Sequence, residues 1–87
     1  MTFQEFLVDA TPKQRVIFCK ALQHTAPKEV PSEQKQEIAD DITSYSEMLT
    51  ENDLFEVNRA VKILIEVEGF PYAEEQTVID FLQNYTR

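Results

Sequence analysis

The sequence contains one histidine, His24, and one cysteine, Cys19, the residue types best suited to proton transfer and nucleophilic attack. Catalysis by either side chain needs a second reactive group beside it, and no local spacing supplies one. His24 lies near the end of an expected helix, where a cation favours the helix dipole, and we expect it at the surface. A free cysteine such as Cys19 is more often a small buried hydrophobe than a reactive thiolate. We therefore expect no catalytic residue, and a protein that is not an enzyme.

The 16 acidic side chains are the other candidate ligands in the chain. The best stretch to test for calcium, residues 41–52, lacks the glycine at the sixth position and the glutamate at the twelfth that a calcium loop requires. No pair of histidines stands at the spacing of a transition-metal site, and one cysteine cannot build a thiolate cage. Gly69 is the only glycine, which argues against a glycine-rich phosphate loop. We expect no metal and no cofactor.

Net charge divides the chain unevenly. Residues 1–30 hold four basic and three acidic side chains, whereas residues 31–87 hold four basic and thirteen acidic ones. The net charge of −8 disfavours nucleic acid and anionic membrane surfaces as direct ligands and favours a partner with a basic surface. No apolar stretch is long enough to span a membrane, and a single cysteine suits a reducing compartment, so we expect a cytoplasmic protein.

The elements that must position these residues are helices. Eighty-seven residues make one small domain, and the scarcity of glycine argues against hairpins. Apolar periodicity predicts five helices, near residues 3–9, 12–25, 32–49, 51–68 and 72–85. Thr2, Thr11, Ser32 and Thr50 are the expected N-caps, and Gly69 marks an end. The predicted fold class is all-α, a compact single-domain bundle of four to five helices over residues 1–87.

Segment 51–68 is apolar over about half of its helical wheel, which is typical of a central helix. Its part 61–67 also alternates as a strand would, and a helix is preferred because a strand would lack partners. Val16 and Cys19 lie off the main apolar face of segment 12–25. That apparent surplus of apolar surface predicts a homodimer built on segment 12–25 or segment 51–68.

Segment 32–49 has the most regular pattern of charge. A narrow apolar stripe of Ile38, Ile42, Tyr45 and Leu49 predicts the side that meets the core. The opposite side carries the four candidate partner-binding residues, Glu33, Glu37, Asp40 and Glu47. One interpretation is a solvated face that keeps the protein soluble. The other is a docking surface for a basic protein.

The sequence therefore predicts a non-enzymatic binding module, a regulator or inhibitor that docks on a basic protein surface through this acidic helical face. Two alternatives stay open. One is an acidic mimic of nucleic acid that blocks a DNA- or RNA-binding protein, and it requires carboxylates spread along an elongated surface. The other is a structural subunit of a homo-oligomer.

Overall fold

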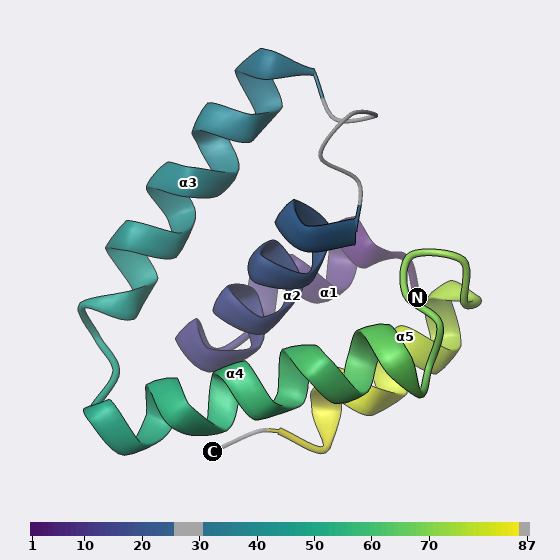
Figure 1. Cartoon of the computed structure of the whole chain (residues 1–87). Helices are drawn as coiled ribbons and strands as arrows, with labels where there is room; N and C mark the ends of the chain where they lie inside the picture. The colour runs from purple at the N-terminus through teal and green to yellow at the C-terminus, as the bar shows by residue number, and fades with distance from the viewer. Residues whose placement is uncertain (26–30, 86–87) are drawn as a thin grey trace.

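The computed structural model describes residues 1–25 and 31–85, which form five helices and no strand. The helices are α1 (Phe3–Asp9), α2 (Pro12–Thr25), α3 (Ser32–Ser46), α4 (Glu51–Glu66) and α5 (Glu75–Gln83) (Figure 1). They pack into a compact all-α bundle whose principal extents are 30 × 26 × 24 Å. The predicted fold class is confirmed.

Both ends of α5 and the ends of α3 and α4 depart from the predicted boundaries, and α5 ends at Gln83 rather than near residue 85. α3 ends at Ser46 rather than near residue 49, and α4 ends at Glu66 rather than near residue 68. Gly69 has a φ of 75°, a left-handed value that favours glycine, and the Phe70 N–H donates to the Leu64 carbonyl, 3.2 Å away. Because the chain turns again after Gly69, α5 begins only at Glu75. The alternating segment 61–67 is helical through Glu66, so the preference for helix was right.

Reciprocal hydrogen bonds define two helix starts. The Thr50 hydroxyl accepts from the Asp53 N–H (3.1 Å), and the Asp53 carboxylate accepts from the Thr50 N–H (3.2 Å), which completes a capping box. Thr11 and Gln14 exchange the same two bonds at 3.2 and 2.9 Å. The buried Gln14 amide also donates to the Leu82 carbonyl at 3.0 Å, which ties the start of α2 to α5.

The predicted cap at Ser32 is wrong. Ser32 is already the first residue of α3, the N-cap position is Pro31, and no side chain caps that end. Proline has no side-chain oxygen that could accept from the first N–H groups of α3. Thr2, by contrast, caps α1 as predicted, and its hydroxyl accepts from the Glu5 N–H at 3.2 Å.

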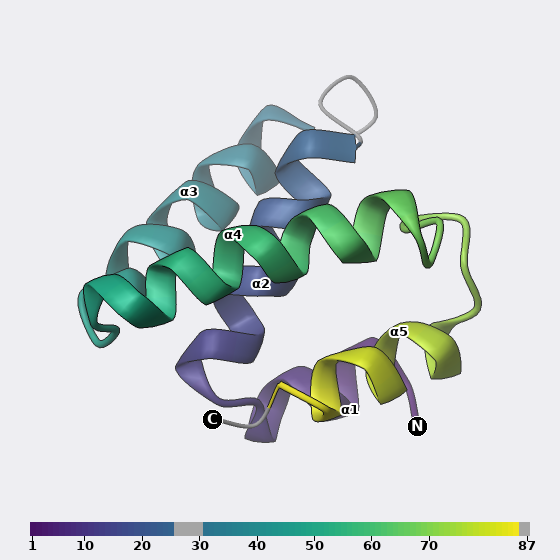
Figure 2. The same cartoon turned by 60° about the horizontal axis from the view of Figure 1, so that its bottom comes forward.

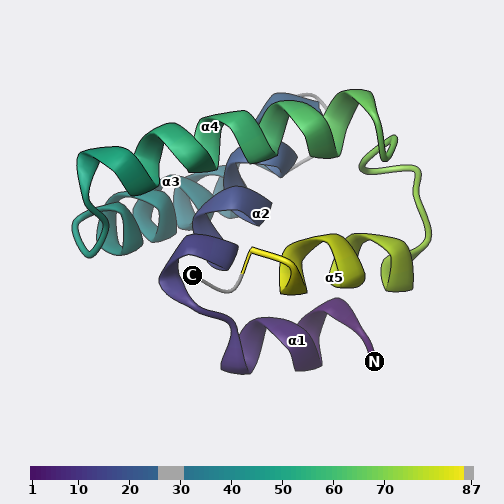
Figure 3. The same ribbon diagram turned by 90° about the horizontal axis from the view of Figure 1, so that it is seen from below.

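The central helix is α2, and the prediction that segment 51–68 is central was wrong. α2 packs against α3, α4 and α5, and α1 packs against α5, so α2 lies between two layers (Figure 3). The two layers require apolar residues on both sides of α2, and Val16 and Ile17 are fully buried. Cys19 is also buried within the single chain. The surplus apolar surface at Val16 and Cys19, which suggested a homodimer, is thus covered by the protein itself.

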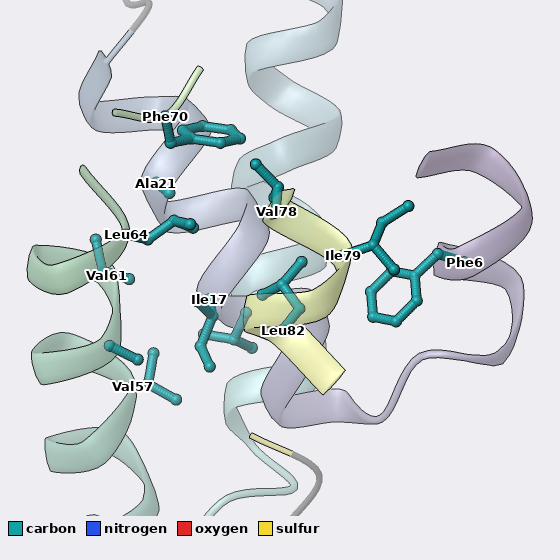
Figure 4. Close-up of a cluster of buried hydrophobic side chains, with 12 residues drawn as sticks. Phe6, Ile17, Ala21, Val57, Val61, Leu64, Phe70, Val78, Ile79 and Leu82 are labelled. Atoms are coloured by element: carbon teal, nitrogen blue, oxygen red, sulfur yellow. The ribbon is translucent and has the colours of Figure 1, made fainter. Parts of the chain in front are cut away.

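The core is a single cluster that draws on every described helix except α3 (Figure 4). Its buried members are Phe6, Val16, Ile17, Ala21, Val57, Ala60, Val61, Leu64, Phe70, Val78, Ile79 and Leu82. The Phe18 ring joins this cluster to α1 and to the segment after α4, at 5.1 Å from the Phe3 ring and 5.6 Å from the Phe70 ring. Such aromatic contacts add to burial alone.

α3 is an outer helix with no fully buried residue. Tyr45 and Leu49 pack against the edge of the core, and the Arg15 guanidinium lies over the Tyr45 ring, 5.3 Å from its centroid. Ile38 and Ile42 are only half-buried and do not join the core cluster, contrary to the expectation of a full core stripe. α3 nevertheless packs along α2 (Figure 1), and Tyr45 and Leu49 are the stripe residues that reach the core.

Candidate functional site

The structure places the four predicted partner-binding residues on the surface of α3 and of the turn that follows it. Glu33, Glu37 and Asp40 lie within α3, and Glu47 directly follows it. All four are exposed. Because the apolar side of α3 packs on α2, the four carboxylates face away from the bundle.

The acidic face of α3, defined as Glu33, Glu37, Asp40 and Glu47, has no basic partner in the described residues. The one ion pair found within residues 1–25 and 31–85 joins Lys13 to Glu56, on other helices. Asp40 accepts a hydrogen bond from the Gln36 amide, one turn earlier, at 3.0 Å. This bond fixes the Asp40 carboxylate without neutralising its charge, so the acidic face keeps its negative potential.

A fifth carboxylate of α3, Asp41, was not part of the predicted site. It is partly buried on the flank of the helix, and its charge acts on Cys19 of α2. Its position between the acidic face and the apolar stripe of α3 could have been read from the helical wheel. Asp41 lies on the side of α3 toward α2 and is not a further member of the acidic face.

The two candidate reactive side chains have the structural places expected of them. Burial raises the pKa of the Cys19 thiol to about 11, and the Asp41 carboxylate adds to this effect, so the thiol stays protonated at neutral pH. His24 is exposed in the last turn of α2. The two side chains are five residues apart on one helix, and Cys19 lacks the thiolate character that nucleophilic catalysis requires.

The described residues contain two notable hollows. The larger, of about 300 Å³, has Glu5, Asp9 and Gln14 among its lining residues. The smaller, of about 200 Å³, is lined by Lys13, Glu56, Arg59, Asn84 and Tyr85. Neither brings a nucleophile and a general base together.

The Lys13–Glu56 pair in the smaller hollow was missed by sequence reasoning. The Lys13 side chain is only 3% exposed, whereas the Glu56 side chain is 43% exposed. A lysine in the first turn of a helix is normally expected at the surface. Lys13 and Glu56 are also far apart in the sequence, so no local pattern links them. The pair links α2 to α4, and it satisfies the charge of Lys13 where burial would otherwise be costly.

No group of three or more His, Cys, Asp or Glu side chains in residues 1–25 and 31–85 has the arrangement of a metal site. Within the same ranges, no helix combines the length and the apolar character needed to cross a bilayer.

The chain was compared with protein-family models, curated proteins and solved structures. The chain matches no protein-family model, no curated protein and no solved structure.

Proposed function

We propose that this protein is a non-enzymatic binding module, a regulator or inhibitor that docks on a basic surface of another protein through the acidic face of α3. One observation carries the proposal. Four exposed carboxylates, without a basic partner in the described residues, lie on α3 or directly after it. α3 is the one described helix that contributes no buried residue. A helix that is so little needed for the core can vary its outer face without loss of the fold.

The physical advantage of such a face is electrostatic. Carboxylates gathered on one side raise the local negative potential, which speeds the encounter with a basic surface and repels nucleic acid. The gain depends on ionic strength, because the screening length is about 8 Å at physiological salt. Binding through this face should therefore weaken as salt rises.

The alternative of a nucleic-acid mimic has less support. A mimic needs carboxylates along an elongated surface, but the molecule is nearly as wide as it is long, at 30 × 26 × 24 Å. The acidic face of α3 covers one helix and does not extend around the bundle. A single docking face on another protein fits these dimensions better.

The test compares two doubly substituted proteins that carry the same net charge. The first, Glu37→Lys with Asp40→Lys, reverses the centre of the acidic face. The matched control, Glu75→Lys with Asp80→Lys, makes the same change on α5, where both residues are exposed. Asp80 accepts from the Gln76 amide at 2.8 Å, just as Asp40 accepts from Gln36, so each variant loses an equivalent local hydrogen bond.

Each protein is immobilised and exposed to nuclease-treated lysate of the native organism, then washed at low and at high salt. We expect the wild type and the α5 control to retain the same protein partner and the α3 variant to lose it. Retention should fall at high salt. Equal retention by all three proteins would contradict the proposal. A retained partner that added DNA or RNA displaces would favour the mimic instead.

A further inference from the structure

The outer face of α4 carries an unusual exposed side chain. The core side of this helix is formed by Val57, Ala60, Val61 and Leu64, all buried. Seven positions face outward and are exposed: Glu51, Asn52, Phe55, Asn58, Arg59, Lys62 and Glu66. Six of them are polar, and the seventh, Phe55, is 69% exposed. No other helix of the described chain covers this face (Figure 2).

Phe55 is not explained by the packing of the single chain. It lies on the opposite side of α4 from the core residues, because a helix turns by about 100° per residue. It takes no part in the aromatic contacts of Phe18 or in the core cluster. Leaving a phenyl ring in water is unfavourable, and aromatic residues, Phe among them, are enriched at protein interfaces.

The polar residues before and after Phe55 form matching pairs. One pair consists of two asparagines, and the other consists of side chains of opposite charge. Glu51 lies four residues before Phe55, and Arg59 lies four residues after it. Asn52 and Asn58 lie three residues before and three residues after. The Asn58 side-chain oxygen accepts from the Lys20 ammonium of α2 at 3.2 Å, which leaves the Asn58 amide N–H groups for a partner. The charges nearest to the ring are therefore negative on its N-terminal side, at Glu51, and positive on its C-terminal side, at Arg59, each about 6 Å along the helix axis from Phe55.

We propose that this face binds a second copy of the same chain, with the two α4 helices antiparallel across a two-fold axis that passes between the Phe55 rings. In this arrangement residue 55+n of one copy meets residue 55−n of the other. Glu51 then faces the partner's Arg59, and this ion pair occurs twice. Asn52 faces the partner's Asn58, and the two Phe55 rings stack at the axis.

Charge complementarity selects the second copy over other occupants. A uniformly basic partner would meet Arg59 and Lys62, and a uniformly acidic partner would meet Glu51 and Glu66. Within about one turn of Phe55, only a surface with the reversed order of charges suits both Glu51 and Arg59, and the antiparallel copy of α4 has that order. The proposed dimer does not involve the acidic face of α3, so its test is independent of the test of the proposed function.

The proposed dimer is weak. A single helix face buries much less than the roughly 1,600 Å² of a standard interface. The net charge of −8 on each copy also opposes association. We expect a dissociation constant on the order of 100 µM at physiological salt. Sedimentation equilibrium from 10 µM to 1 mM should therefore show a monomer that becomes a dimer.

The anchor is tested by Phe55→Ala, with Tyr72→Ala as its matched control. Tyr72 is 85% exposed but lies after α4, away from the proposed axis. Because the substitution occurs in both copies, Phe55→Ala should weaken association by at least about tenfold. Tyr72→Ala should leave it unchanged. Equal dissociation constants for the two variants, or a wild type that stays monomeric at 1 mM, would overturn the proposal.

The charge order is tested by two single variants, Glu51→Arg and Arg59→Glu. The first makes both flanks of Phe55 basic, and the second makes both acidic. Each variant alone should associate at least about tenfold more weakly than the wild type, because like charges then meet across the axis. An equimolar mixture of the two should restore association, since every basic flank then meets an acidic one.

Two controls separate this result from effects of net charge and folding. Glu75→Arg and Lys35→Glu make the same changes of net charge at exposed positions on α5 and α3, and both should self-associate as the wild type does. Circular dichroism confirms that each variant is folded before it is compared. A mixture of Glu51→Arg and Arg59→Glu that associates no better than either variant alone would overturn the antiparallel arrangement.

Discussion

α2 and α3 are helices of 14 and 15 residues that pack against each other, yet they differ in almost every other respect. α2 has six buried residues, two of them polar, whereas α3 has none. The difference follows from how apolar residues are distributed around each helix. α2 has them on two sides and can be covered by two layers, whereas α3 has one narrow stripe and leaves its opposite face open. The stability of this fold therefore depends on α2, and the candidate binding residues lie on α3.

The largest expected effect comes from truncating the core side of α2. Ile17→Ala removes a fully buried side chain and should reduce the free energy of unfolding by about 2–5 kcal/mol. Ile42→Ala on α3 removes a half-buried side chain and should cost about 1 kcal/mol. Urea denaturation of the two variants measures both values. Equal losses would mean that α3 contributes to the core as much as α2 does.

The next effect concerns the polar residue that α2 buries. Glu56→Gln keeps an oxygen that can accept from Lys13 but removes the charge opposite the buried ammonium. It should cost about 2–3 kcal/mol, less than for a fully buried pair because Glu56 is half in water. Lys13→Met removes the charge and keeps the length of the side chain, so it should cost less than Glu56→Gln. Thermal unfolding at neutral pH compares the two. A larger loss for Lys13→Met would show that the hydrogen bond, and not the burial of charge, decides the stability.

A smaller effect distinguishes the starts of α4 and α3. Thr50→Ala removes the capping box of α4 and should cost about 1 kcal/mol. Ser32→Ala should change the unfolding midpoint little, because Ser32 makes no capping hydrogen bond. A clear loss for Ser32→Ala would contradict the observed start of α3.

The capping box also gives a dependence on pH. Hydrogen bonds from the Thr50 N–H and hydroxyl lower the pKa of Asp53 below its ordinary value of 3.8. A carboxyl group with a lowered pKa in the folded state stabilises the fold above its ordinary pKa and loses this effect as pH falls through the lowered value. The difference between the wild type and Asp53→Asn should therefore be largest at neutral pH and shrink in acid. Denaturation midpoints at a series of pH values measure this difference.

The sequence was sufficient to predict the five helices but not which helices pack against each other. Caps and apolar spacing are local signals, and they gave all five helices and three of the four N-caps. Which helix is central, in contrast, depends on contacts between residues that are far apart in the sequence. Segment 51–68 has the wider apolar surface, but Phe55 and Val67 are exposed, whereas Val16 and Cys19 of α2 are covered from a second side. Apolar residues on two sides of α2 were visible in the sequence and were misread as a surface for a second subunit.

The candidate site could be predicted because it depends on one helix. Once the apolar stripe of α3 fixes which side meets α2, the positions of Glu33, Glu37, Asp40 and Glu47 follow from helical geometry. The Lys13–Glu56 pair could not be predicted, because it joins residues on different helices. The exposure of Phe55 was not predicted either, because it depends on which side of α4 packs against the other helices.

The smallest expected effect on stability is the most informative about function. Glu37→Lys with Asp40→Lys changes two exposed residues, and exposed charges contribute roughly 0–1 kcal/mol to folding. The first substitution also places a lysine four residues after Glu33 and four before Asp41, so an attractive pair replaces the repulsion between Glu33 and Glu37. The melting midpoint should stay within a few degrees of the wild type or rise slightly. Since the same variant is expected to lose the partner, binding and stability would separate on α3, whereas on α2 every substitution of a buried residue affects the fold first. A variant that unfolds well below the wild type would show that the acidic face supports the fold, and the contrast between the two helices would then be wrong.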